Sequence, residues 1–193
     1  MNYFLAQALN NQWANHRLLG ACARLSEPDY LAHRSGFFPS LQATLCHILE
    51  VDRYYLTALE GDSNGQRQDF AQTLALAPLV QAQTRTDQRL VAFCQALQEP
   101  DLSRTVELVR ADGVVRERID RLLLHLFEHQ IHHRGQVHGM LSGTSVKPPQ
   151  LDEFFLDCDR PYRLEDERQL TLDAGRIWQD YVQTRTDPLE NPP

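Results

Sequence analysis

Two histidines stand four residues apart, at His129 and His133, within the segment HLFEHQIHHRGQVHGML. On a helix this spacing places both imidazoles on one face, with about 5–6 Å between their Cβ atoms. Two imidazoles so placed can bind one divalent ion at Zn–N distances of about 2.0–2.1 Å. Because such a pair can equally be two hydrogen-bonded histidines, the surrounding pattern has to decide between the two interpretations.

That pattern indicates that the pair faces the inside of a helical bundle. Residues repeat in alternating steps of three and four along a single row: Ile119, Leu122, Leu126, His129, His133, Gln136 and Met140. Burying unpartnered polar groups in such a row would cost about 1–3 kcal/mol each, and a bound ion would satisfy them. His47, in the apolar segment TLCHILEVDRYYL, is the candidate third ligand from another helix. Alternatively, His47 is a core histidine that is held by hydrogen bonds and binds no ion.

Four further polar residues lie close to these histidines in the sequence. Glu50 follows His47 by three residues and could orient its ring or accept a proton, and Asp52 is the other acid at that depth. For both acids a solvated or helix-pairing carboxylate is an equally good interpretation. Gln136 could hydrogen-bond a bound water or ligand. Arg134 could bind the carboxylate of a cofactor or have a structural role.

The other five histidines are weaker candidates. His125 precedes the pair by one turn and could reach the edge of the site. His16 lies on the first predicted helix and could line the same cavity. We expect His132 and His138 to face solvent or another subunit, while His33 lies in a predicted loop.

Turn residues divide the chain into four long helices and a tail. Ser26-Glu-Pro-Asp is a stop-and-turn signal, Pro39-Ser40 opens the second helix, and an Asp-Gly pair indicates a β-hairpin within residues 101–115. The fold class predicted is all-α: a four-helix bundle, with a hairpin before the fourth helix and an extra C-terminal helix. The predicted helices cover about 2–25, 39–60, 78–98, 115–142 and 164–184.

Composition excludes several classes of function. The 193 residues suit one domain, and the formal net charge of −7 argues against binding to DNA or anionic lipid. No apolar run approaches the roughly 18–20 residues of a membrane span, and the N-terminus lacks a secretory signal pattern. We expect a soluble cytoplasmic protein without nucleic-acid or membrane partners. The four cysteines form no metal-ligating pair and are expected to be buried free thiols: Cys22, Cys46, Cys94 and Cys158.

The segments around His47 and the HxxxHRGQ motif resemble the two signature stretches of the DinB/YfiT-like metalloenzyme family. The segments NQWANHRLL and SGTSVKPPQLD fit the same resemblance. It covers residues 1–157 and leaves 158–193 as a C-terminal extension with one helix and a loose tail. It implies a four-helix bundle, a homodimer, and one divalent ion (zinc, nickel or iron) bound by three histidines. These carry over to His47, His129 and His133.

Three protein ligands leave a coordination position open, as in catalytic rather than structural zinc sites. By resemblance, the leading function is transfer of a low-molecular-weight thiol, whose sulfur attacks a small-molecule electrophile as thiolate. The alternative within enzymes is metal-dependent hydrolysis with Glu50 as base. A non-catalytic metal-binding or stress-response protein is the third interpretation.

Overall fold

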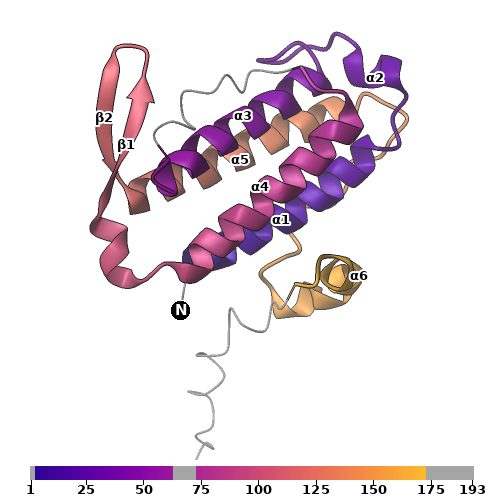
Figure 1. The fold of residues 1–193 in the computed structure, drawn as a ribbon. Coiled ribbons are helices and arrows are strands. Elements are labelled where there is room, and N and C mark those ends of the chain that lie inside the picture. Colours follow the sequence, from indigo (N-terminus) through magenta and orange to yellow (C-terminus); the bar gives the residue numbers. More distant parts are fainter. Residues whose placement is uncertain (1–2, 63–72, 173–193) are drawn as a thin grey trace, which may run out of the picture.

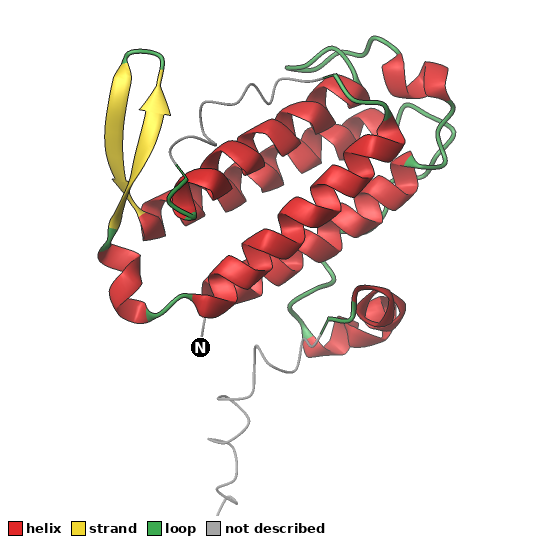
Figure 2. Cartoon of the chain, in the orientation of Figure 1, coloured by secondary structure: helices red, strands yellow, loops and turns green. Residues whose placement is uncertain are grey.

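The computed structural model describes residues 3–62 and 73–172, and a bundle of four helices forms its centre (Figure 1). The bundle helices are α1 (Tyr3–Cys22), α3 (Leu41–Leu59), α4 (Leu76–Ala96) and α5 (Ile119–Leu141). α1 packs along α4 and α3 packs along α5, while α3–α4 and α1–α5 contacts close the bundle. The predicted all-α class, with one small hairpin, is confirmed (Figure 2).

Side-chain caps set the helix boundaries at the end of the bundle that holds α2. The Ser40 hydroxyl accepts a hydrogen bond from the backbone nitrogen of Ala43 and starts α3, as predicted. Ser26 does the same for Asp29 and opens a short helix that the sequence analysis missed, α2 (Glu27–Leu31). Serine followed by proline within two residues is as good a helix start as it is a turn, and here the helix forms.

The predicted hairpin is present but longer than expected. β1 (Thr105–Arg110) pairs antiparallel with β2 (Gly113–Arg118), and Gly113 adopts a φ of 140° beside the turn. The prediction that α5 begins near Val115 was wrong, because Val115 pairs with Leu108 across the hairpin. β-branched valines suit this pleated surface better than a helix. A 3-10 helix, η2 (Glu99–Ser103), leads into β1.

α5 buries a broader face than the single predicted row. Most of that row is buried, whereas His129 and Gln136 are partly exposed. A second row is also buried because α5 contacts both α3 and α1: Leu123, Gln130, Arg134, Val137 and Leu141. Two polar side chains, Gln130 and Arg134, therefore lie in the core beside the predicted seam.

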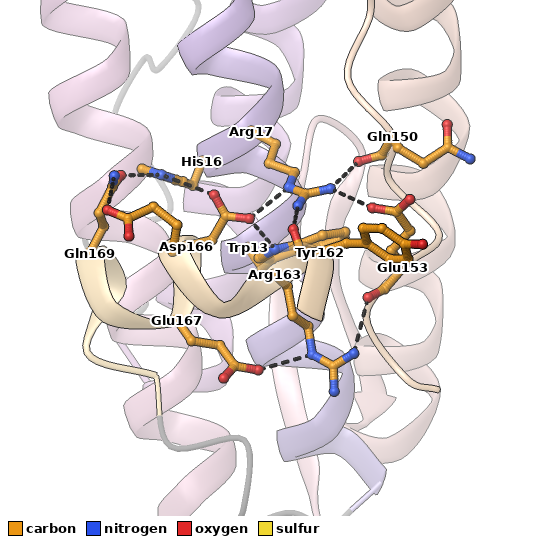
Figure 3. A network of polar contacts seen from close by, with 11 residues as sticks. Trp13, His16, Arg17, Gln150, Glu153, Tyr162, Arg163, Asp166, Glu167 and Gln169 are labelled. Carbon is orange, nitrogen blue, oxygen red and sulfur yellow. Dashed lines mark hydrogen bonds and ion pairs between the residues drawn. The ribbon is translucent and has the colours of Figure 1, made fainter. Parts of the chain in front are cut away.

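The described part of the C-terminal extension folds back onto α1 (Figure 3). After the 3-10 helix η3 (Asp157–Asp159) comes α6 (Arg160–Leu170). Asp166 accepts hydrogen bonds from Trp13 Nε1 at 3.0 Å and from Arg17 Nε at 2.7 Å. Arg17 also pairs with Glu153 at 3.0 Å, so one arginine of α1 holds two segments that follow the bundle.

The predicted last helix, 164–184, differs from the observed one. α6 begins at Arg160, where Pro161 can occupy the first turn, and ends before Thr171, whose φ is +53°. Residues 173–184 of the prediction lie outside the described residues. The division into 1–157 and 158–193 stays a prediction. Among the described residues, none of the helices combines the length and apolar character needed to cross a membrane.

The cysteines are free thiols, as predicted, but not all of them are buried. Cys22 and Cys94 lie in the core, Cys46 is half-buried and Cys158 is exposed. Cys46 Sγ accepts a hydrogen bond from the backbone nitrogen of Leu74 at 3.3 Å. It therefore does not join its neighbour His47 as a ligand, because adjacent helix residues point about 100° apart.

Candidate metal centre

Three imidazoles from two helices converge on one point. His47 lies on α3, His129 and His133 lie on α5, and one ring nitrogen of each lies within 4.8 Å of the others. The Nε2 atoms of His47 and His129 are 3.1 Å apart. Two nitrogens bound tetrahedrally at Zn–N distances of 2.0–2.1 Å would be about 3.3 Å apart. This pair therefore has nearly the spacing that a shared ion requires, and the nitrogen of His133 lies within 4.8 Å of it.

The backbone explains why these three meet. The four-residue spacing stacks the rings of His129 and His133, with centroids 4.4 Å apart. α3 lies beside α5, and places the His47 ring 5.0 Å from that of His129 and 4.8 Å from that of His133. The triad predicted from the sequence is therefore brought together.

Gln136 orients one member of the triad. His133 Nδ1 lies 2.8 Å from Gln136 Oε1, and the Gln136 amide nitrogen lies 3.0 Å from His132 Nε2. An amide oxygen only accepts, so Nδ1 of His133 carries the proton and its Nε2 keeps a free lone pair. Metal-binding histidines are commonly held by such a partner on the second ring nitrogen. This contact gives Gln136 a positioning role at the site, and its predicted catalytic role stays a prediction.

The other two histidines of the triad, His47 and His129, differ in the contacts of their Nδ1 atoms. The Glu50 carboxylate lies 3.9 Å from His47 Nδ1, on the side of the ring away from His129. This contact suits the orienting role considered for Glu50, and its role as a base stays a prediction. His129 Nδ1 is buried without a hydrogen-bond partner among the described residues. The nitrogen of this ring that faces His47 is Nε2, so an ion held between the two Nε2 atoms would leave Nδ1 of His129 without a partner in the described part of the chain.

Burial keeps these rings neutral. Desolvation, together with the neighbouring histidines, lowers the pKa of His129 to about 3. The pKa values of His47 and His133 are also lowered, chiefly by desolvation. Neutral imidazole is the form that binds metal. The three donors are therefore available at neutral pH.

Phe38 covers the cluster, and the sequence analysis did not single it out. Its ring centroid lies 4.4 Å from that of His47 and 5.7 Å from that of His133. The adjacent aromatic pair Phe37-Phe38, separated from the N-cap of α3 by Pro39 alone, was the available signal. Phe37 is 78% exposed, so only one of the two rings shields the site from water.

The remaining histidines lie outside the triad. His125 packs against Tyr55, and its ring centroid is 6.3 Å from that of His129. His132 is exposed, as predicted. His138 is partly buried and contacts the Pro149 carbonyl oxygen at 2.9 Å, so the expectation that it faces solvent or another subunit was wrong.

His16 also departs from expectation. Its Nε2 lies 3.1 Å from Gln169 Oε1 and 3.9 Å from an Asp166 oxygen (Figure 3). It therefore belongs to the contact between α1 and α6 and does not line the histidine site.

Arg134 and Asp52 belong to a buried polar network that crosses the bundle. Arg134 is 5% exposed and donates to Asn11, Asn15 and Gln130. Asp52 accepts from Gln83 at 2.7 Å and from Gln130. All four bundle helices contribute to this network: Asn11, Asn15, Asp52, Gln83, Asp87, Gln130 and Arg134. The geometry supports the structural role considered for Arg134, and its cofactor-binding role stays a prediction.

The network holds charges in the core. Burial raises the pKa of both Asp52 and Asp87, and the proximity of Asp52 raises that of Asp87 further. Burial lowers the pKa of Arg134 to about 10, so its guanidinium remains charged at neutral pH. One cation therefore offsets two carboxyls that resist ionisation.

Comparison with protein-family models identifies the family of this chain. The model described as "DinB family" matches residues 1–165. The chain belongs to the DinB family. The match covers the bundle and reaches into α6, and the three histidines fit a metal-binding DinB-like protein. The family resemblance inferred from the sequence is confirmed.

Two proteins of Bacillus subtilis are similar to this chain in sequence. Protein DinB of Bacillus subtilis is 24% identical over 145 residues, which are 68% of this chain and 80% of that protein. The uncharacterized protein YizA of the same organism is 29% identical over 118 residues, 60% of this chain and 72% of its own length.

Solved structures share the fold. A DinB-like protein of B. subtilis, YjoA, superposes with a TM-score of 0.56 at 21% identity, over 77% of this chain and 97% of its own. A DinB-like protein of Bacillus cereus gives a TM-score of 0.53 at 15% identity, over 72% of this chain and 90% of its own. At these identities the structural likeness extends to the fold alone.

Proposed function

We propose that this protein is a metal-dependent enzyme that transfers a low-molecular-weight thiol to a small electrophile. The convergence of His47, His129 and His133, all kept neutral by burial, carries the proposal. The ion would be zinc, nickel or iron. When bound, it would lower the pKa of a thiol or water so that the nucleophile is an anion near neutral pH.

The protein's own residues would bind the ion, orient its histidine ligands and shield the site from water. Gln136 holds the His133 ring with its Nε2 lone pair free. Phe38 covers the rings of His47 and His133 and limits the access of water. In the transfer step the thiol sulfur forms a bond to the electrophilic carbon, the leaving group departs with its electron pair, and the thiol proton passes to solvent or to Glu50.

Hydrolysis is the second candidate, with Glu50 as the base that accepts a proton from the attacking water. The Glu50 carboxylate lies 3.9 Å from Nδ1 of His47, on the outer side of that ring, so this role requires its side chain to turn toward the ion. A non-catalytic metal-binding or stress-response protein remains the alternative to both.

Cobalt-loaded protein separates these functions. Under thiol transfer, 2-mercaptoethanol should produce a sulfur-to-cobalt absorption band, and the loaded protein should conjugate the thiol to 1-chloro-2,4-dinitrobenzene. A hydrolase should give neither result but should cleave an activated ester, with a rate that rises with pH. Stoichiometric cobalt without turnover of either kind would leave a binding protein.

We also propose a homodimer, on the family resemblance, and a cytoplasmic location, as the sequence pattern leads us to expect. Sedimentation equilibrium of the purified chain tests the first: twice the 22.2 kDa chain mass is the expected result. Fractionation of the source cells tests the second.

A further inference from the structure

A cavity adjoins the candidate metal centre. Its volume is about 460 Å³, and its walls are residues 33–36 of the loop before α3 and the C-terminal part of α5. Gln136 lines it and also accepts the hydrogen bond of His133. Phe38, which covers the triad, belongs to the same loop. We name this space the Arg34 cavity, after the arginine in its wall.

The loop that forms the cavity is firmly placed. The Arg34 backbone nitrogen donates to the Pro39 carbonyl at 2.8 Å and closes the loop on itself. A Cβ at Gly36 would lie 2.6 Å from Met140 Cε, so the loop backbone packs directly on α5. A volume of a few hundred cubic ångströms with fixed walls is typical of small-ligand sites. The cavity therefore exists before any ligand arrives.

Arg34 supplies the cavity's positive charge. Its Nη2 donates to the Asp29 carbonyl at 3.0 Å, while its Nε is buried without a hydrogen-bond partner among the described residues. No carboxylate lines the cavity; the nearest acid, Asp29, lies 3.8 Å from Nη2 and its side chain is 45% exposed. A guanidinium has five N–H donors, and this one retains donors for an anion.

We propose that the Arg34 cavity binds the carboxylate of the thiol whose sulfur reaches the histidine triad. This inference rests on the thiol-dependent function proposed above and names the substrate class: small thiols that carry a carboxylate. A single guanidinium, partly offset by Asp29, matches a singly charged carboxylate better than a doubly charged phosphate. Gln136, shared by the cavity and His133, places the two ends of such a ligand about one helical turn apart.

Matched thiols test the proposal on cobalt-loaded protein. Each acid is compared with the alcohol of equal length: 3-mercaptopropionate with 3-mercaptopropanol, and 6-mercaptohexanoate with 6-mercaptohexanol. Dissociation constants come from the sulfur-to-cobalt absorption band. For at least one length, the acid should bind about tenfold more tightly than the alcohol. Arg34→Gln should abolish this preference and leave the affinity for the alcohol unchanged.

Two controls distinguish an effect of the Arg34 cavity from a change in overall charge and from misfolding of the variant. Arg24→Gln removes an exposed arginine that contacts the Gly20 carbonyl, and it should keep the acid preference. A measurement on the unaltered protein covers the case in which Arg34→Gln fails to fold: the acid preference should shrink as salt rises, and the affinity for the alcohol should not.

Equal binding of acid and alcohol by the wild type would overturn the inference and leave thiol transfer standing. A preference that survives in Arg34→Gln, or that is insensitive to salt, would overturn it as well. A cobalt-loaded protein whose spectrum responds to no thiol would defeat the proposed function and the inference together.

Discussion

Nδ1 of His133 lies 2.8 Å from the side-chain oxygen of Gln136, one turn further along α5. The contact fixes which nitrogen of the ring carries the proton and which is free to bind an ion. Gln136 both holds the ring of His133 and lines the Arg34 cavity. It therefore links the orientation of the metal centre to the cavity through which a substrate would enter.

Replacing Gln136 should weaken metal binding without unfolding the bundle. Gln136→Ala removes the acceptor that holds His133, and partners of this kind typically contribute 10- to 100-fold in metal affinity. Competition with a chromogenic chelator measures the dissociation constant. Gln88→Ala, on an exposed face of α4, is the matched control. Equal affinities in Gln136→Ala and the control would show that the contact does not position the ring.

Phe38 should control how fast the ion leaves. Phe38→Ala opens the cover over His47 and His133 and gives water and chelators access to the ion, so metal loss to excess EDTA should accelerate by about tenfold. Phe37→Ala alters the neighbouring ring, which is 78% exposed, and should leave the rate unchanged. Stopped-flow absorbance of the cobalt form follows the release. Identical rates of metal release in the two variants would show that Phe38 does not shield the ion.

Arg17 should anchor the C-terminal segment. Its bonds to Asp166 and Glu153 are charge-assisted and partly buried, so Arg17→Ala should lower the free energy of unfolding by about 1–3 kcal/mol. Arg168→Ala breaks an exposed pair with Glu165, and its effect should stay within about 0.5 kcal/mol. Urea unfolding compares the two variants. A loss in Arg17→Ala no larger than in Arg168→Ala would mean that α6 does not stabilise the bundle.

Asp52 and Asp87 should lower the stability of the fold as pH rises through their folded pKa values, about 6 for Asp52 and about 8 for Asp87. Burial raises the pKa of both, so the folded chain holds protons that the unfolded chain releases above about pH 4. Their contribution to stability is complete below the unfolded pKa and is lost as pH rises through the raised folded values. The triad histidines, with lowered pKa values, act in the opposite sense, but only up to about pH 7.

Urea unfolding of the metal-free protein between pH 7 and 8 therefore reports chiefly Asp87. Its pKa is raised to about 8, whereas Asp52, with a pKa of about 6, is already ionised in this range. The free energy of unfolding should fall with pH, by at most about 1.4 kcal/mol per pH unit for each proton released. Asp87→Asn should flatten the slope, whereas Asp152→Asn, on the surface, should not. A wild-type slope of zero, or one that Asp87→Asn leaves unchanged, would mean that Asp87 is already ionised in the folded chain.

The His129–His133 pair could be predicted because its signal is local. The two histidines share a helix face through their spacing, and the bundle followed from the same periodicity. Both depend on residues within one or two turns of each other, where helical geometry fixes which side chains meet. His47 lies on another helix: it stood out as a polar residue in an apolar segment, and the family resemblance joined it to the pair.

The buried network and Phe38 could not be predicted in the same way. Asn11, Gln83 and Asp87 look like exposed residues in any window of their own helices. They become core residues only because partners from the other helices satisfy them. Phe38 reaches the triad because the backbone of its loop closes on itself at Pro39. These features arise from tertiary contacts that a single sequence does not reveal.

We infer that His47, His129 and His133 together bind one ion. We would measure the metal content of the untagged protein by elemental analysis, beside His129→Ala and His138→Ala. His138 is a sound control because it contacts the Pro149 carbonyl instead of the triad. The structure predicts about one ion per chain in the wild type and in His138→Ala, and none in His129→Ala. Full metal content in His129→Ala, or a wild type that takes up no zinc, nickel or iron, would contradict the assignment.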